Sequence, residues 1–162
     1  MINVKVFIDT EIWVFAKKKP VLSNFAKKSE FNEAKELHIK SKEFLKKQIS
    51  ENEILITDHQ LAEIYHVLGF RGLKLPLESV KKYCIQLISS KFVRRYSISL
   101  DHLIESIKLS RQSGIHIWDY LCVIPLRADA DVLYSCDAHF KDHTFQSLGP
   151  KIINPLNKWF KY

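Results

Sequence analysis

Short apolar runs alternate with longer amphipathic segments along this chain. Five mainly apolar runs have the length of β-strands: 4–8, 53–56, 92–98, 132–136 and 151–153. Between the first four runs, apolar residues mostly recur at the three- and four-residue spacing of an α-helix, over about 30–50, 57–68, 76–90, 100–113 and 116–128. No helix is predicted between the last two runs. Strands that alternate with helices predict an α/β fold, with a mostly parallel five-stranded sheet covered by helices on both faces.

Several residues are typical of helix boundaries. We expect Thr57 and Ser99 to cap the N-termini of two helices, and Gly114 to end the helix that Ser99 begins. Gly69 and Gly72 are expected to break the helix that follows Thr57, and Pro76 to start the next one.

The composition is that of an ordinary folded domain. The chain has 162 residues, of which 46% are hydrophobic, with only 4 glycines and 5 prolines. These values exclude a disordered or fibrous chain and predict one domain over residues 1–162. The apolar part of the N-terminus is too short for a signal peptide, and no later stretch approaches the roughly 18 apolar residues of a membrane span. We therefore expect a cytoplasmic protein with no membrane segment.

The chain is basic, with a formal net charge of +7 at pH 7. A surface of this charge attracts polyanions, which makes nucleic acid a reasonable partner. Arg94, Arg95 and the lysines between Lys17 and Lys28 are candidates to contact an RNA backbone. Solvation of helix faces explains these residues equally well, so the charge leaves the partner open.

The cysteines Cys84, Cys122 and Cys136 are odd in number and lack a C-x-x-C spacing. This pattern indicates neither a disulfide framework nor a zinc knuckle. We expect three buried free thiols.

Four acidic residues are candidates for chemistry. Asp9 and Asp137 follow apolar runs, and open parallel sheets bind ligands at the C-terminal ends of their strands. Each also has a structural explanation as a turn or helix-capping residue. A solvated helix face would explain Glu63, and the first turn of a helix would favour Asp119 without any catalytic role.

Gathered in one pocket, these four carboxylates would repel one another unless a divalent cation neutralised them. Ligation by oxygen alone suits Mg²⁺ or Mn²⁺ better than Zn²⁺. Such a site activates water and stabilises the charge that builds on a scissile phosphate. The four acids together therefore predict metal-dependent cleavage of a phosphodiester bond.

Five short motifs follow one another along nearly the whole chain. They are FIDT at 7–10, LAEI at 61–64, IWDY at 117–120, YSCDAHF at 134–140 and INPL at 153–156. Their order and spacing resemble those of PIN-domain nucleases, especially the VapC-type toxins of toxin–antitoxin pairs.

The resemblance implies a three-layer α/β/α sandwich, a Mg²⁺ or Mn²⁺ site at the C-terminal edge of the sheet, and endonucleolytic cleavage of RNA. It implies that Asp9, Glu63, Asp119 and Asp137 occupy the acidic metal-binding and catalytic positions. Thr10 then occupies the hydroxyl position beside the first aspartate.

Two positions depart from the common pattern of these nucleases. Glu11 stands where many have asparagine, and its charge is expected to alter the metal geometry. His139 stands where many carry a further acid, and Asp142 has the wrong register to replace it. We expect His139 and His143 to be exposed loop residues without a role, and Asp142 to be a surface residue.

The resemblance also implies a homodimer and an antitoxin protein whose peptide fills the acidic groove. Helix 76–90 could supply an apolar interface, although periodicity does not distinguish an interface from an intramolecular core. The small size of the chain fits best with the toxin of a type II toxin–antitoxin system. The alternatives are a PIN nuclease of RNA processing or quality control, a non-catalytic RNA- or protein-binding module, and a phosphatase or other hydrolase with the same metal chemistry.

Overall fold

A parallel sheet is the frame of the molecule, whose computed structural model describes residues 3–161. Within this range the sheet has five strands: β1 (Lys5–Ile8), β2 (Glu53–Thr57), β3 (Val93–Tyr96), β4 (Val132–Tyr134) and β5 (Lys151–Ile153). Their order across the sheet is β3-β2-β1-β4-β5, and every neighbouring pair is parallel. The predicted five-stranded parallel sheet is confirmed.

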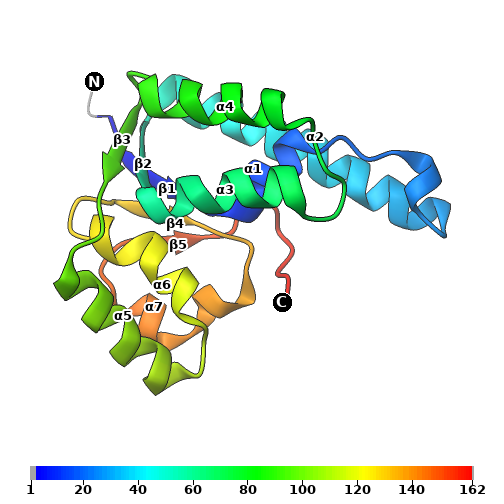
Figure 1. The fold of residues 1–162 in the computed structure, drawn as a ribbon. Helices are drawn as coiled ribbons and strands as arrows, with labels where there is room; N and C mark the ends of the chain where they lie inside the picture. The colour runs from blue at the N-terminus through cyan, green and yellow to red at the C-terminus, as the bar shows by residue number, and fades with distance from the viewer. Residues whose placement is uncertain (1–2, 162) are drawn as a thin grey trace.

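Helices cover both faces of this sheet (Figure 1). The α-helices are α1 (Thr10–Lys17), α2 (Lys28–Glu51), α3 (Asp58–Phe70), α4 (Leu77–Ser89), α5 (Leu100–Ser113), α6 (Ile117–Val123) and α7 (His143–Gln146). The short 3-10 helices η1 (Leu22–Asn24), η2 (Ile124–Leu126) and η3 (Ala138–Lys141) lie between them. Helices α1 to α4 pack on one face, and α5 to α7 lie on the other. The result is a three-layer α/β/α sandwich.

Alternate residues of β1 face opposite cores, as the two-residue side-chain period of a strand requires. Val6 and Ile8 belong to the core beneath α1 to α4, whereas Phe7 packs with Tyr120 and Phe145 on the other side. These three side chains are completely buried. Burial on both faces explains why three consecutive residues of the strand are apolar.

The middle position of β1 brings its C-terminal end to the centre of one sheet edge. The Asp9 N–H donates to the Tyr134 carbonyl at 2.8 Å, which extends the pairing of β1 with β4. Beyond β4, Asp137 forms an isolated parallel bridge with Phe160 near the C-terminus. Asp9 and Asp137 are therefore held at the same edge of the sheet.

Most of the expected helix boundaries are confirmed. The Thr57 hydroxyl accepts a hydrogen bond from the Gln60 N–H at the start of α3. Ser99 and His102 form a reciprocal capping box at the start of α5. Gly114 ends α5 with a φ of 74°, a left-handed conformation that favours glycine.

Of the two expected helix breakers, Gly72 lies just beyond the end of α3 with a φ of 51°, whereas Gly69 does not break the helix. Gly69 lies inside α3, which continues to Phe70. A Cβ atom on Gly69 would lie 2.7 Å from Leu77 Cδ2, so the missing side chain makes room for the first residue of α4. Close packing, and not a turn, explains this glycine.

Three further segments differ from expectation. Helix α1 directly follows β1, where no helix was predicted. The predicted helix over 116–128 is α-helical only to Val123 and then continues as η2, with Pro125 in the first turn of that 3-10 helix. Helix α7 lies between β4 and β5, where no helix was predicted. Its four residues are too few to show a helical period, so the sequence pattern carries no signal for it.

No helix among residues 3–161 combines the length and the apolar character that crossing a membrane requires.

Candidate functional site

Asp9 lies at the junction of β1 and α1, where its side chain is only 8% exposed. Its Oδ1 atom accepts a hydrogen bond of 2.8 Å from the Thr10 N–H and so caps α1. Its Oδ2 atom accepts a hydrogen bond of 2.6 Å from the Ser135 hydroxyl. The capping role and a place in the acidic cluster therefore belong to the same carboxylate.

Ser135 joins Asp9 to Asp137. Its Oγ atom donates to Asp9 and accepts a hydrogen bond of 3.0 Å from the Asp137 N–H. The Asp137 carboxylate in turn accepts from the His139 N–H at 2.9 Å. Because Ser135 and Asp137 are both buried, this network fixes the second aspartate relative to the first.

Asp119 enters the same region from the first turn of α6. His139 Nδ1 lies 2.8 Å from Asp119 Oδ2, a distance at which the imidazole donates a hydrogen bond to the carboxylate. His116 Nε2 lies 3.5 Å from the same oxygen. Two imidazoles thus surround one oxygen of Asp119.

The three aspartates lie close enough for their charges to act on one another. Burial raises the pKa of Asp9 well above its ordinary value, and the charges of Asp119 and Asp137 raise it further. Burial also raises the pKa of Asp119 to about 6, although the hydrogen bond from His139 lowers it. The fold therefore holds buried carboxylates whose ionised forms are unfavourable without a nearby cation.

Glu63 flanks this cluster from α3. Its Oε2 atom accepts a hydrogen bond of 2.8 Å from the Thr10 hydroxyl and one of 3.4 Å from the Cys122 thiol. Burial raises the pKa of Cys122, and the charges of Glu63, Asp9 and Asp119 contribute to the rise. Cys122 thus contacts Glu63 and lies close enough to Asp9 and Asp119 to feel their charges.

The donor set fits a divalent metal ion. Asp9, Asp119 and Asp137 supply hard carboxylate oxygens from three different segments, as cations such as Mg²⁺ and Mn²⁺ require. The potential ligand atoms of His116, Asp119 and His139 also lie within 4.8 Å of one another. The aspartates whose charges act on Asp9 are therefore, together with Asp9, the residues that would hold a cation.

The two departures from the common nuclease pattern have different consequences. The charge of Glu11 raises the pKa of Asp9, so Glu11 adds negative potential to the cluster as expected. The expectation that His139 has no role is wrong, because its ring pairs with Asp119. Asp142 instead accepts hydrogen bonds from Thr144 and caps α7, which agrees with its register.

Sequence reasoning missed several residues of this region. Ser135 stands two positions before Asp137, and the alternation of β4 is the signal that could have placed it on the site. His116 lies three residues before Asp119, the helical spacing at which side chains meet. His59 and Cys122 carried no signal, because their proximity depends on how α3 packs on α6.

Some basic residues have structural roles. Lys18 Nζ donates to the carbonyls of Val67 and Arg71 at the end of α3, and burial lowers its pKa. Arg94 and Arg95 on β3 form ion pairs with Asp129 and Asp58, at 3.8 and 3.4 Å. These partners account for part of the basic surface without a nucleic acid.

Comparison with known proteins agrees with this architecture. No family model and no curated protein matches the chain. Among solved structures, it is similar to VapC20 from Mycobacterium tuberculosis, described as a Sarcin-Ricin loop cleaving toxin. The two share 16% sequence identity and superpose with a TM-score of 0.60, over 84% of this chain and 92% of the toxin.

The fold is PIN-like. The three-layer sandwich implied by the sequence motifs is thereby confirmed. In this PIN-like fold, Asp9 follows the central strand, Asp137 follows its neighbour, and Asp119 and Glu63 approach from α6 and α3.

The raised pKa values predict how the stability of the metal-free protein depends on pH. The native state binds protons at Asp9 and Asp119 more tightly than the unfolded chain does, so these groups stabilise the fold as the pH falls through about 6. Between pH 7.5 and 5.5, we expect Asp119 to add about 1 kcal/mol, or roughly 2 to 4 °C in melting temperature. Thermal unfolding in EDTA at both pH values measures this gain.

The control for this prediction is Asp119→Asn, which carries no charge at either pH. Its gain on acidification should be smaller than that of the wild-type protein. An equal or larger gain in the variant would show that Asp119 is not held in an unfavourable ionised state.

Proposed function

We propose that this protein is a metal-dependent endoribonuclease, acting in the cytoplasm as the toxin of a type II toxin–antitoxin system. The observation that carries the proposal is the convergence of Asp9, Asp119 and Asp137 at the C-terminal edge of a PIN-like sheet. Burial raises the pKa values of Asp9 and Asp119, and the negative charge of neighbouring aspartates raises both further, as expected of ligands that bind a cation. Glu63 completes the proposed catalytic set from α3.

The residues around the carboxylates support a preorganised site. When bound, a divalent cation supplies positive charge that offsets the carboxylates and stabilises the charge that develops on a scissile phosphate. Ser135 orients Asp9, and His139 orients Asp119. Thr10 fixes one oxygen of Glu63 through its hydroxyl. Each acid is thus held by a neighbouring donor before a cation arrives, which lowers the cost of organising the site.

The donor set supports Mg²⁺ or Mn²⁺ as the metal, with a bias toward Mn²⁺. Carboxylate oxygens suit both ions. Imidazole nitrogen is a better ligand for transition metals than for Mg²⁺, and His116 and His139 both lie beside Asp119. We therefore expect Mn²⁺ to support at least as much activity as Mg²⁺.

RNA is the substrate that the remaining observations favour. The formal charge of +7 favours a polyanion. The toxin to which the fold is similar is described as cleaving the Sarcin-Ricin loop, and we extend cleavage of RNA to this chain. The acidic cluster also suits a basic side chain of an antitoxin, which would occupy the position of the cation.

The outer face of α4 supports a homodimer. Ile85 is 55% exposed and Ile88 is 49% exposed, and the two residues lie about one helical turn apart. Leu77 at the start of the helix is also exposed. Large exposed apolar side chains grouped on one helix are typical of an interaction surface.

The first test is cleavage of a mixed pool of structured and single-stranded RNA with Mg²⁺, Mn²⁺ or EDTA. We expect cutting that requires metal, with the rate reduced on the order of 100-fold or more in Asp9→Asn and in Asp119→Asn. Asp142→Asn is the matched control, because asparagine also caps helices and Asp142 lies outside the cluster. It should cut like the wild-type protein.

If the protein binds RNA but never cuts it, the proposed nuclease activity is wrong and a non-catalytic binding module is favoured. Metal-dependent hydrolysis of small phosphoesters without cleavage of RNA would favour a phosphatase. Full activity in Asp9→Asn would refute the assignment of the site.

The toxin role has a separate test in a bacterial host. Expression of the wild-type chain alone should arrest growth, because free nuclease destroys RNA, whereas Asp9→Asn should be harmless. Co-expression of the cognate antitoxin should restore growth. A chain that cuts RNA in vitro and leaves growth unchanged would instead favour RNA processing or quality control.

The dimer is tested by light scattering after size-exclusion chromatography. The wild-type protein should show twice the mass of one chain, and Ile85→Glu should show the mass of one chain because a charge cannot be buried at an apolar interface without cost. Ile39→Glu places the same charge on α2, where Ile39 is also exposed, and should remain dimeric. A monomeric wild-type protein would contradict the proposal, as would dissociation by the α2 variant alone.

A further inference from the structure

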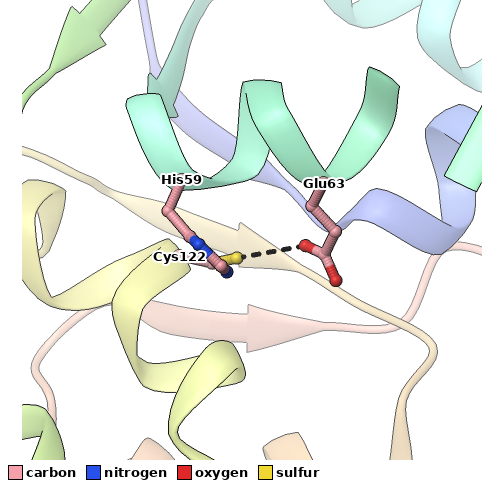
Figure 2. A group of neighbouring side chains, drawn as sticks. All are labelled: His59, Glu63 and Cys122. Carbon is pink, nitrogen blue, oxygen red and sulfur yellow. Dashed lines mark hydrogen bonds between the residues drawn. The ribbon is translucent and has the colours of Figure 1, made fainter. Parts of the chain in front are cut away.

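Helices α3 and α6 bring an imidazole, a carboxylate and a thiol together beside the acidic cluster. His59 and Glu63 lie one helical turn apart on the same face of α3. Cys122 faces them from α6, and Figure 2 shows its thiol beside the imidazole, with the Glu63 carboxylate opposite. The potential ligand atoms of the three residues lie within 4.8 Å of one another.

The hydrogen bonding of this group is incomplete. His59 Nε2 is buried and has no hydrogen-bond partner among residues 3–161. A buried polar atom without a partner costs free energy, and a ligand that satisfies it recovers that cost. Cys122 is only 2% exposed, and its thiol makes one weak hydrogen bond to a side chain of the described residues, the 3.4 Å bond to Glu63. The nitrogen and the sulfur thus both retain capacity to bind a ligand.

The donors are already oriented. The Thr10 hydroxyl holds Glu63 Oε2 at 2.8 Å. The His59 ring stacks on Trp118, with 5.3 Å between ring centroids and 12° between ring planes. These contacts limit the rotamers of His59 and Glu63, so less entropy is lost when both bind one ligand.

We propose that His59, Glu63 and Cys122 form a binding site for a thiophilic divalent cation, Zn²⁺ in the first place. Nitrogen, oxygen and sulfur donors suit Zn²⁺, whereas Mg²⁺ and Ca²⁺ require oxygen. As the metal–sulfur bond forms, the Cys122 sulfur donates an electron pair to the ion and the thiol proton passes to solvent. Three protein ligands leave a fourth position open.

This site shares Glu63 with the acidic cluster. One consequence, which rests on the proposed nuclease function, is that bound Zn²⁺ withdraws Glu63 from the catalytic carboxylates and inhibits cleavage. Two cation sites that compete for one carboxylate would make the enzyme sensitive to the balance of zinc and manganese.

Titration of the purified full chain with Co²⁺ tests the binding site without any assay of activity. Cobalt bound to a thiolate gives a sulfur-to-metal charge-transfer absorption, which the cysteine-free group of His116, Asp119 and His139 does not produce. We expect this band to saturate at one Co²⁺ per chain and to disappear on addition of Zn²⁺.

Substitutions show which residues bind the metal. Cys122→Ser should abolish the band, and Cys84→Ser, at another buried free cysteine, should keep it. His59→Gln should weaken binding by more than the roughly 10- to 100-fold that loss of a supporting residue costs. Unfolding curves show whether each variant is folded, and His59→Gln tests the site even if Cys122→Ser does not fold.

The outcomes separate the two proposals. An absent band, or a band that persists in folded Cys122→Ser, overturns the zinc site and leaves the nuclease untouched. Zn²⁺ should inhibit RNA cleavage by the wild-type protein more strongly than by His59→Gln, and equal inhibition overturns the regulatory role. Absence of RNA cleavage overturns the nuclease alone, because the cobalt band does not depend on it.

Discussion

The parallel pairing of β1 with β4 is the constraint on which the candidate site depends. The Asp9 N–H continues that pairing by donating to the Tyr134 carbonyl, so the chain turns into α1 at the level where β4 ends. Ser135 then reaches Asp9 with its hydroxyl and receives the Asp137 N–H. A slip of one residue between the strands would turn these side chains to opposite faces and separate the two carboxylates.

The acidic cluster makes the fold less stable in the absence of a cation. Buried aspartates whose pKa values rise through desolvation and mutual repulsion oppose folding at neutral pH. Hydrogen bonds from Ser135 to Asp9 and from His139 to Asp119 offset part of this cost and hold these two carboxylates in one orientation. Unfavourable charge kept in a fixed geometry is characteristic of a functional site.

Helix α6 links the two groups of donors. Its first turn carries Asp119 into the acidic cluster, and one turn later Cys122 faces α3. Glu63 receives contacts from both sides, through Thr10 and Cys122. Glu63 therefore belongs both to the acidic cluster and to the group with His59 and Cys122. A cation bound at one of these groups changes the electrostatic potential at the other.

The sequence by itself determined the strands and most helices, because local periodicity and helix capping depend on neighbouring residues, and it gave the four acids as candidates. Thr57, Ser99 and Gly114 act locally, and their predicted roles hold. Helix α7 was too short to show a period. The local pattern predicts a helix break at Gly69, because its contact with Leu77 is a packing contact between two helices, which the local sequence does not show.

The partners of the site were decided only by tertiary structure. His139 pairs with Asp119 across 20 positions of the sequence, and Ser135 reaches Asp9 across 126. His59 meets Cys122 across 63 positions. Contacts at such separations follow from how strands register and helices pack, which no local pattern records.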